Sequence, residues 1–249
     1  MLVHWYLAGQ RIPPLEVRAR TCHGARVQPN APLCRRLIAG TRSALAWCVG
    51  NREELARLLV AIAAGDHSLV TASLVAAPAL ATARLGRRDE FFIAECHAQV
   101  YEGDTALHAA AFAYDIGLAR DLVARGADVR ACNRHGAEPL HAAVIGEPGA
   151  TNWDPPSQRM VITYLIDAGA DPNARARGGV TPLHRAVRNR CSAAVDALLR
   201  AGADPRATND HGSTPSDLAR WTTGRGGVGS EAAKLEQQTI LDLLDQAMA

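Results

Sequence analysis

The sequence repeats a four-residue motif at a nearly constant spacing. Three copies contain threonine or glutamate, then alanine or proline, then leucine and histidine, and a fourth copy has decayed. The copies begin at Thr105, Glu138, Thr181 and Thr214, at intervals of 33, 43 and 33 residues. A Gly-Ala-Asp triplet keeps the same step from Gly126 to Gly169 and Gly202. Two motifs that share one period indicate stacked units rather than a domain closed around a single core.

Within each unit the sequence predicts two short helices followed by a turn. Thr181-Pro182 places a hydroxyl at a helix N-cap and a proline at the first helical position, and Thr214-Pro215 repeats the arrangement. The second helix has apolar residues at positions i, i+1, i+4 and i+5. These are Leu118, Ala119, Leu122 and Val123, then Val161, Ile162, Leu165 and Ile166, then Ala194, Val195, Leu198 and Leu199. A glycine follows each set and ends the helix. Each helix pair therefore exposes two apolar faces and needs neighbours.

These motifs resemble those of the ankyrin repeat family, and the resemblance covers roughly residues 51–249. It implies an all-α solenoid of stacked helix-turn-helix units with turn or β-hairpin fingers. We expect four clear repeats and one degenerate repeat before them. They span residues 51–99, 100–132, 133–175, 176–208 and 209–249. In the degenerate repeat, Asn51 with Glu54 predicts a capping box. Its first helix is expected at Leu58–Ala64 and its second at Ser68–Ala77.

Three segments depart from the regular spacing. The link from Pro78 to Gly103 is long and carries Phe91-Phe92-Ile93, which predicts an extended finger or a short β-hairpin. About ten extra residues fall within Glu147–Gln158 and about twelve around Thr222–Lys234. Both insertions lie between the two helices of a unit, so we expect them on the same edge of the solenoid.

Residues 1–50 carry no repeat signature and are expected to form a basic, poorly ordered leader. Residues 1–40 contain six arginines against Glu16, so the segment could bind nucleic acid or an anionic membrane surface. A solvated leader is the simpler interpretation, and the net charge of +2 gives no reason to expect a nucleic acid partner. The longest uncharged run, Leu69–Ala83, is too short to span a membrane. Scattered cysteines without a C-x-x-C pair indicate free thiols in a cytoplasmic protein, and we expect a monomer.

Several residues suggest chemistry at first sight. The motif histidines His108, His141 and His184 could form a metal row, but neighbouring units would set them about 10 Å apart, too far to share one ion. The family resemblance implies a structural role instead, with each histidine bonded to loop backbone. Gly224–Gly229 matches G-x-G-x-x-G, yet helices flank it and no parallel sheet is predicted. A flexible insertion is favoured there over an anion site or a nucleotide site. We expect no cofactor and no metal.

The resemblance implies that a partner docks on the turn tips and on the exposed side of the first helices. Four residues after the motif histidine, or after Asp217 in the last unit, the sequence has Phe112, Ile145, Arg188 and Trp221. Arginine, tryptophan and similar side chains are enriched at binding hot spots. The tip candidates are Arg134, His135, Arg175, Arg177, Asp210 and His211, and Arg185 is the candidate on the first helix of the basic third repeat. That repeat has a net charge of +4, which favours a partner with an acidic patch. Alternatively, its arginines only keep the surface soluble.

Together these patterns predict a non-catalytic module that binds another protein. One alternative is a regulatory or immunity-like inhibitor that covers a single enzyme. A less favoured alternative is an enzyme or nucleotide binder built on the two insertions, although the first insertion contains only two carboxylates, Glu147 and Asp154. A repeat fold does not specify its partner.

Overall fold

The computed structural model describes residues 53–93, 98–150, 153–224 and 231–249. The predicted leader, residues 1–50, and the predicted N-cap Asn51 lie outside the described residues. The chain begins its described part with a helix over residues 53–63. The later elements are α2 (His67–Ala76), η1 (Pro78–Ala81), η2 (Arg87–Asp89), β1 (Phe91–Ile93), β2 (Ala98–Val100), α3 (Ala106–Phe112), α4 (Ile116–Ala124), α5 (Pro139–Ala143), α6 (Pro155–Asp167), α7 (Pro182–Arg188), α8 (Ser192–Arg200), α9 (Pro215–Gly224) and α10 (Glu231–Met248).

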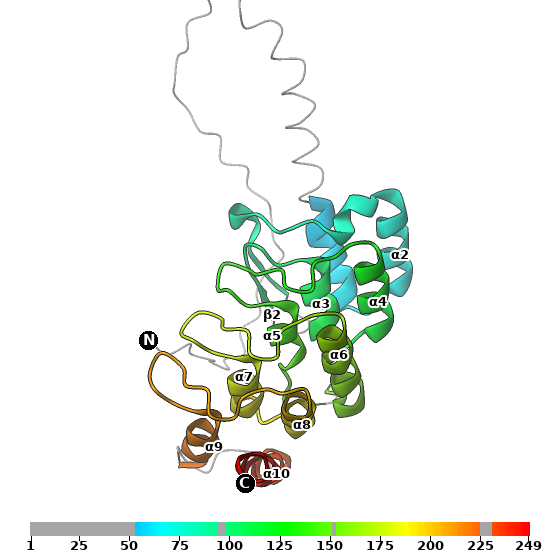
Figure 1. Ribbon diagram of the computed structural model, residues 1–249. Coiled ribbons are helices and arrows are strands. Elements are labelled where there is room, and N and C mark those ends of the chain that lie inside the picture. Colours follow the sequence, from blue (N-terminus) through cyan, green and yellow to red (C-terminus); the bar gives the residue numbers. More distant parts are fainter. Residues whose placement is uncertain (1–52, 94–97, 151–152, 225–230) are drawn as a thin grey trace, which may run out of the picture. The chain divides into compact units, whose positions relative to one another are not determined.

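The helices stack in two layers (Figure 1). Helices α3, α5, α7 and α9 contact one another in sequence and form the layer of first helices. Helices α4, α6, α8 and α10 form the layer of second helices in the same way. Each first helix also contacts the second helix of its own unit. The predicted all-α solenoid is therefore confirmed. In the degenerate unit the first helix is longer than predicted, since it already includes residue 53.

Leucine and alanine fill the interior, as the scarcity of aromatic residues requires. The motif leucines Leu107, Leu140 and Leu183 are fully buried. In α3, Ala106, Ala110 and Ala111 are also fully buried, and these small side chains let neighbouring helices approach closely. In each predicted second helix the first three apolar residues of the pattern are buried and the fourth is half-buried. The i, i+1, i+4, i+5 pattern thus identified the core-facing side correctly.

The turns have the backbone that the glycines predicted. Gly126, Gly169 and Gly202 have φ angles of 91°, 106° and 85°, and they follow α4, α6 and α8. The predicted finger is a hairpin, in which β1 pairs with β2 in antiparallel register from Phe91 and Val100 to Ile93 and Ala98. Residues 94–97 between the two strands lie outside the described residues.

The first insertion is only partly a loop. Its residues lead from α5 into α6, which begins at Pro155 with Asp154 as its N-cap. The last four residues of the predicted range, Glu147–Gln158, are therefore helical, and α6 is longer than α4 or α8. An Asp-Pro pair is a strong helix start, which explains why the extra residues lengthen the helix.

A buried polar network holds this insertion against the core. Gln158 is fully buried; its amide donates to the carbonyl of Ala143 over 3.0 Å and accepts from Nε1 of Trp153 over 3.1 Å. The hydroxyl of Tyr114 donates to the carbonyl of Ile145. Tyr114 has a φ of 56°, a left-handed backbone that a non-glycine residue adopts at a cost of about 1 kcal/mol. The network places the first insertion at the end of the first helices. Residues 225–230 of the second insertion lie outside the described residues, so a shared edge for the two insertions stays a prediction.

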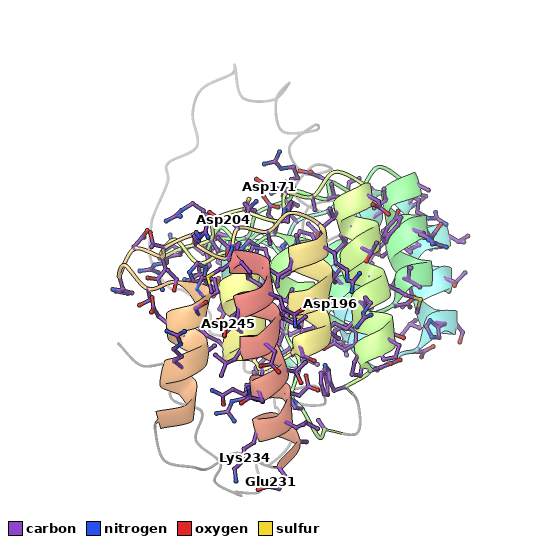
Figure 2. The ribbon with its side chains drawn as sticks, turned by 60° about the horizontal axis from the view of Figure 1, so that its bottom comes forward. Asp171, Asp196, Asp204, Glu231, Lys234 and Asp245 are labelled. Atoms are coloured by element: carbon purple, nitrogen blue, oxygen red, sulfur yellow. The ribbon has the colours of Figure 1, made fainter. Side chains whose placement is uncertain are left out.

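The C-terminal helix α10 packs against the first helix of its own unit and the second helix of the unit before it. Ile240 and Leu244 of α10 are buried, and α10 packs on α8 and α9. Figure 2 brings this end forward, with Glu231 and Lys234 at the start of α10. The second predicted insertion is also partly helical, because α9 runs to Gly224 and α10 begins at Glu231. Within the described ranges, no helix is long and apolar enough to cross a membrane.

Candidate partner-binding surface

The motif histidines join each unit to the next one. Nδ1 of His108 accepts from the backbone N–H of Thr105 over 3.2 Å, so the ring proton is on Nε2. Nε2–H then donates to the carbonyl of Ala137, which belongs to the following unit, over 3.0 Å. His141 and His184 make the equivalent bonds to the carbonyls of Val180 and Ser213, over 3.2 Å and 3.0 Å. The structural role implied by the family resemblance is confirmed.

Burial keeps these imidazoles neutral. Desolvation lowers the pKa of His108, His141 and His184, and it lowers the pKa of His141 to about 3. Both nitrogens of each ring are hydrogen-bonded, so none of the three histidines offers a free lone pair to a metal ion. In the part of the chain that the structure describes, no group of three His, Cys, Asp or Glu side chains could hold a metal.

The aspartates of the Gly-Ala-Asp triplets shape turns. The carboxylates of Asp128, Asp171 and Asp204 each accept from the backbone N–H two residues later, over 2.8–2.9 Å. Figure 2 shows Asp171 and Asp204 along the same edge of the stack. This Asx-type bond closes a turn. The interpretation of these aspartates as turn residues is confirmed.

The turn tips are hydrogen-bonded to one another in a row. The backbone N–H of Arg134 donates to the carbonyl of Glu102 over 2.8 Å. The N–H of Arg177 donates to the carbonyl of His135 over 2.7 Å, and the N–H of Asp210 donates to that of Gly178 over 2.9 Å. These bonds fix four consecutive tips side by side, and we call Glu102, Arg134, His135, Arg177, Gly178 and Asp210 the tip row. The structure therefore brings the predicted tip residues of three units to one edge.

In the tip row, Arg134, Arg177 and Asp210 are exposed, whereas Glu102 and His135 are half-buried. Arg134 forms an ion pair with Glu90 and lies over the ring of Tyr101, 5.2 Å from its centroid. Arg175 bonds the carboxylate of Asp210 over 3.3 Å. His211 is exposed at the fourth tip. No carboxylate among the described residues lies within ion-pair distance of the exposed Arg177.

The predicted row along the first helices is uneven. Arg188 ends α7 and is exposed, whereas Phe112 ends α3 and is half-buried. Ile145 is also half-buried, and it lies beyond the end of α5 at Ala143. Trp221 lies in α9, but its side chain is outside the described residues. Among the three members of this row whose side chains the structure describes, Arg188 is the exposed one.

Arg185 connects its own unit to the previous one. Its guanidinium donates to the carbonyl of His141 over 3.1 Å and is half-buried, so it spans two units. Burial, with the charge of Arg188, lowers the pKa of Arg185. Two other arginines of the basic third repeat are engaged away from the tips: Arg200 pairs with Asp196, and Arg206 donates to the carbonyl of Met248.

Sequence reasoning overlooked three residues beside the tips. Tyr101 and Glu102 lie one 33-residue period before Arg134 and His135, so aligning the first tip with the second would have found them. Glu90 has no such signal, because it lies in the long link before β1, outside the repeat period. The ring of Tyr101 meets that of His135 edge-on, with centroids 4.6 Å apart.

The features proposed for alternative chemistry have local roles where they are described. Asp154 caps α6 and accepts from the hydroxyl of Ser157 over 2.6 Å. Burial raises the pKa of Cys191 to about 12, so its thiol is protonated at neutral pH. Gly224 ends α9, and residues 225–230 of the glycine-rich match lie outside the described residues.

Comparison with known families finds two matches within the repeat region. Residues 102–134 match the model described as ankyrin repeat, and residues 165–219 match the model described as ankyrin repeats (many copies). Together they cover the unit with α3 and α4 and a stretch from α6 to α9. No curated protein matches the chain.

Proposed function

Because this chain is an ankyrin repeat protein, and ankyrin repeats are in general protein–protein interaction modules, we propose that it binds a partner protein across the tip row and the exposed side of the first helices. The observation that carries this proposal is the backbone ladder from Glu102 to Asp210, which fixes the tips rigidly side by side. A rigid surface loses little conformational freedom on binding, which favours affinity.

The proposed role is non-catalytic, cytoplasmic and monomeric. The non-catalytic role is supported by the hydrogen bonding, because the motif histidines and the triplet aspartates are engaged within the scaffold. The exposed arginines on and beside the tip row suit a partner with acidic residues. An inhibitor that covers one enzyme would use the same surface, and it would be distinguished by a single stable partner whose activity falls on binding.

Affinity capture from the native host with matched variants tests the proposal. Arg188→Glu should abolish recovery of the partner, with a hot-spot loss of about 2 kcal/mol or more. Trp221→Ala, in the same predicted row, should also weaken recovery. Arg200→Glu is the control, because Arg200 is an exposed arginine of α8 that pairs with Asp196.

Stability measurements separate binding from folding. Arg188→Glu should leave the free energy of unfolding within about 0.5 kcal/mol, as at most surface sites. A partner recovered equally by the wild type, Arg188→Glu and Trp221→Ala would rule out the predicted row along the first helices as its binding site. A large fall in melting temperature for Trp221→Ala would show that its side chain belongs to the core and would remove it from the binding row.

A further inference from the structure

The charge along the tip row changes sign twice. The first tip is acidic, since it carries Glu102, whose backbone N–H donates to the carboxylate of Glu90 over 3.0 Å. The second and third tips are basic, with Arg134 on one and Arg177 on the other. The fourth tip carries Asp210. A short basic centre is therefore bounded by carboxylates on both sides.

A shallow cleft of about 440 Å³ opens between the second and third tips. Three arginines, Arg134, Arg175 and Arg177, line it together with one carboxylate, Asp210. Glu90 pairs with Arg134 from outside the cleft, and Asp210 pairs with Arg175. Three cations thus face two carboxylates, and the charge left over belongs to Arg177.

The surroundings of His135 agree with an excess of positive charge in this cleft. Desolvation lowers the pKa of His135, and the charges of Arg134 and Arg177 lower it further. Arg185 acts in the same direction, and Glu90 acts against them. Several guanidinium charges therefore act on the imidazole of His135, which itself lines the cleft.

We propose that this cleft binds a single carboxylate, the side chain of an aspartate or glutamate in an extended segment of a partner protein, with Arg177 as its main ligand. A guanidinium presents two parallel N–H donors that match the two oxygens of a carboxylate. The inference rests on the proposed function, because it names the chemistry of the partner at the tip row.

The flanking carboxylates favour a peptide over a nucleic acid. Neighbouring units are about 10 Å apart, as packed helices are, and an extended chain advances about 3.3 Å per residue. From a carboxylate bound by Arg177, a segment that crosses the tips would reach Asp210 one unit away, about three residues along, and Glu102 two units away, about six residues along. A strand of regularly spaced phosphates would be repelled at both places. A segment with lysine or arginine about three residues from the acid on the Asp210 side and about six residues from it on the Glu102 side would be attracted at both.

Two synthetic peptides test this on the full chain. One has a glutamate with a lysine three residues to one side and a second lysine six residues to the other, separated by glycines, and its control has glutamine in place of the glutamate. We expect the glutamate peptide to shift the NMR resonances of the Gly178 amide and the Arg177 Nε–H group. Its dissociation constant should be about threefold lower than that of the control, as expected for one exposed ion pair.

Two arginine variants sharpen the result. Arg177→Gln should lower the affinity for the glutamate peptide to that of the control peptide, and Arg200→Gln should change neither affinity. Equal affinities for the two peptides, or unchanged binding by Arg177→Gln with an unchanged melting temperature, would overturn the inference. Tighter, Arg177-dependent binding of a short oligouridine would also overturn it and assign the cleft to nucleic acid. A captured partner that is lost with Arg188→Glu but kept with Arg177→Gln would refute this inference alone and leave the proposed function standing.

Discussion

The middle units of the array and its last unit use one motif position in different ways. In the middle units, a buried histidine such as His184 bonds its own Thr181 and also the carbonyl of Ser213 in the next unit. In the last unit the position is Asp217, whose carboxylate accepts from the N–H of Thr214 over 2.9 Å and from its hydroxyl over 2.7 Å. The aspartate caps its own helix and, among the residues that the structure describes, makes no bond to another unit.

This difference separates two jobs that the motif histidine performs at once. Both residues accept a hydrogen bond from the backbone N–H at the start of the first helix. Only the histidine has a second ring nitrogen, which bonds to the following unit. Within the described residues no tip follows that of the last unit, and the surface beyond α8 is covered by α10 instead. The middle units therefore depend on their neighbours, whereas the last unit depends on its own cap and on α10.

Removal of residues 209–249 should give the largest effect. It takes away the carbonyl that His184 bonds and exposes the apolar faces of α7 and α8, because α9 and α10 pack there. Terminal units act as caps in repeat proteins. The truncated chain should aggregate or lose much of its helical circular dichroism. A monomeric truncation that melts like the full chain would contradict the role of α9 and α10 as a stacked unit.

Acid should weaken the middle units before it weakens the last one. The three motif histidines have lowered pKa values in the folded chain, so below pH about 6.5 the unfolded chain binds more protons and stability falls with pH. Each histidine contributes up to about 1.4 kcal/mol per pH unit in that range. Hydrogen bonds from Thr214 lower the pKa of Asp217, so its contribution is present above pH about 4 and is lost only below it.

Urea denaturation at pH 7, 6, 5 and 4 measures this dependence. We expect the free energy of unfolding to fall steadily from pH 7 towards pH 4. A flat profile between pH 7 and pH 5 would mean that the motif histidines are protonated in the folded chain, against the bonds seen at both ring nitrogens.

Single substitutions at the motif position should destabilise a middle unit more than the last unit. His184→Ala leaves the half-buried carbonyl of Ser213 and the buried N–H of Thr181 without their partner and creates a cavity, at a cost of about 3 kcal/mol. Asp217→Ala removes one helix cap, which costs about 1 kcal/mol. Urea midpoints of the two variants at pH 7 give both values. Equal losses would show that the bond from His184 to the next unit adds nothing to stability.

Much of this fold could be predicted from the sequence, because its determinants are local and periodic. Thr181, His184 and the glycines act through bonds within one unit or to the next, so a motif and a period locate them. The start of α6 at Pro155 was missed because the length difference was assigned wholly to a loop, although Asp154-Pro155 is itself a helix start signal.

The binding surface could be predicted only in outline. The period located Arg134 and Arg177 on neighbouring tips, but it carries no information about which charges are neutralised. The ion pair of Arg134 with Glu90 joins a tip to the irregular link before β1, and Arg185 turns toward a carbonyl of the previous unit. Such pairings depend on side-chain packing between segments that share no repeat position.

Replacement of Glu138 should give an effect about as small as that of Asp217→Ala, and it should be a gain. Glu138 occupies the place of Thr105 and Thr181, whose hydroxyls lie 3.0 Å and 2.8 Å from the Nδ1 atoms of their histidines. Glu138 is buried, and among the described residues its Oε2 has no hydrogen-bond partner. Desolvation raises its pKa, so the ionised carboxylate disfavours folding above the folded-state pKa and the penalty disappears as the pH falls.

Glu138→Thr should therefore raise the free energy of unfolding at pH 7 by about 1 kcal/mol and leave it nearly unchanged at pH 4. Glu147→Thr, at an exposed position in the insertion, is the matched control and should stay within about 0.5 kcal/mol of the wild type at both pH values. Urea midpoints of the wild type and the two variants at both pH values give the four differences in the free energy of unfolding. A loss of stability in Glu138→Thr at pH 7 would show that the carboxylate supports its unit, as Asp217 supports the last one, and the contrast between middle and last units would not extend to this position.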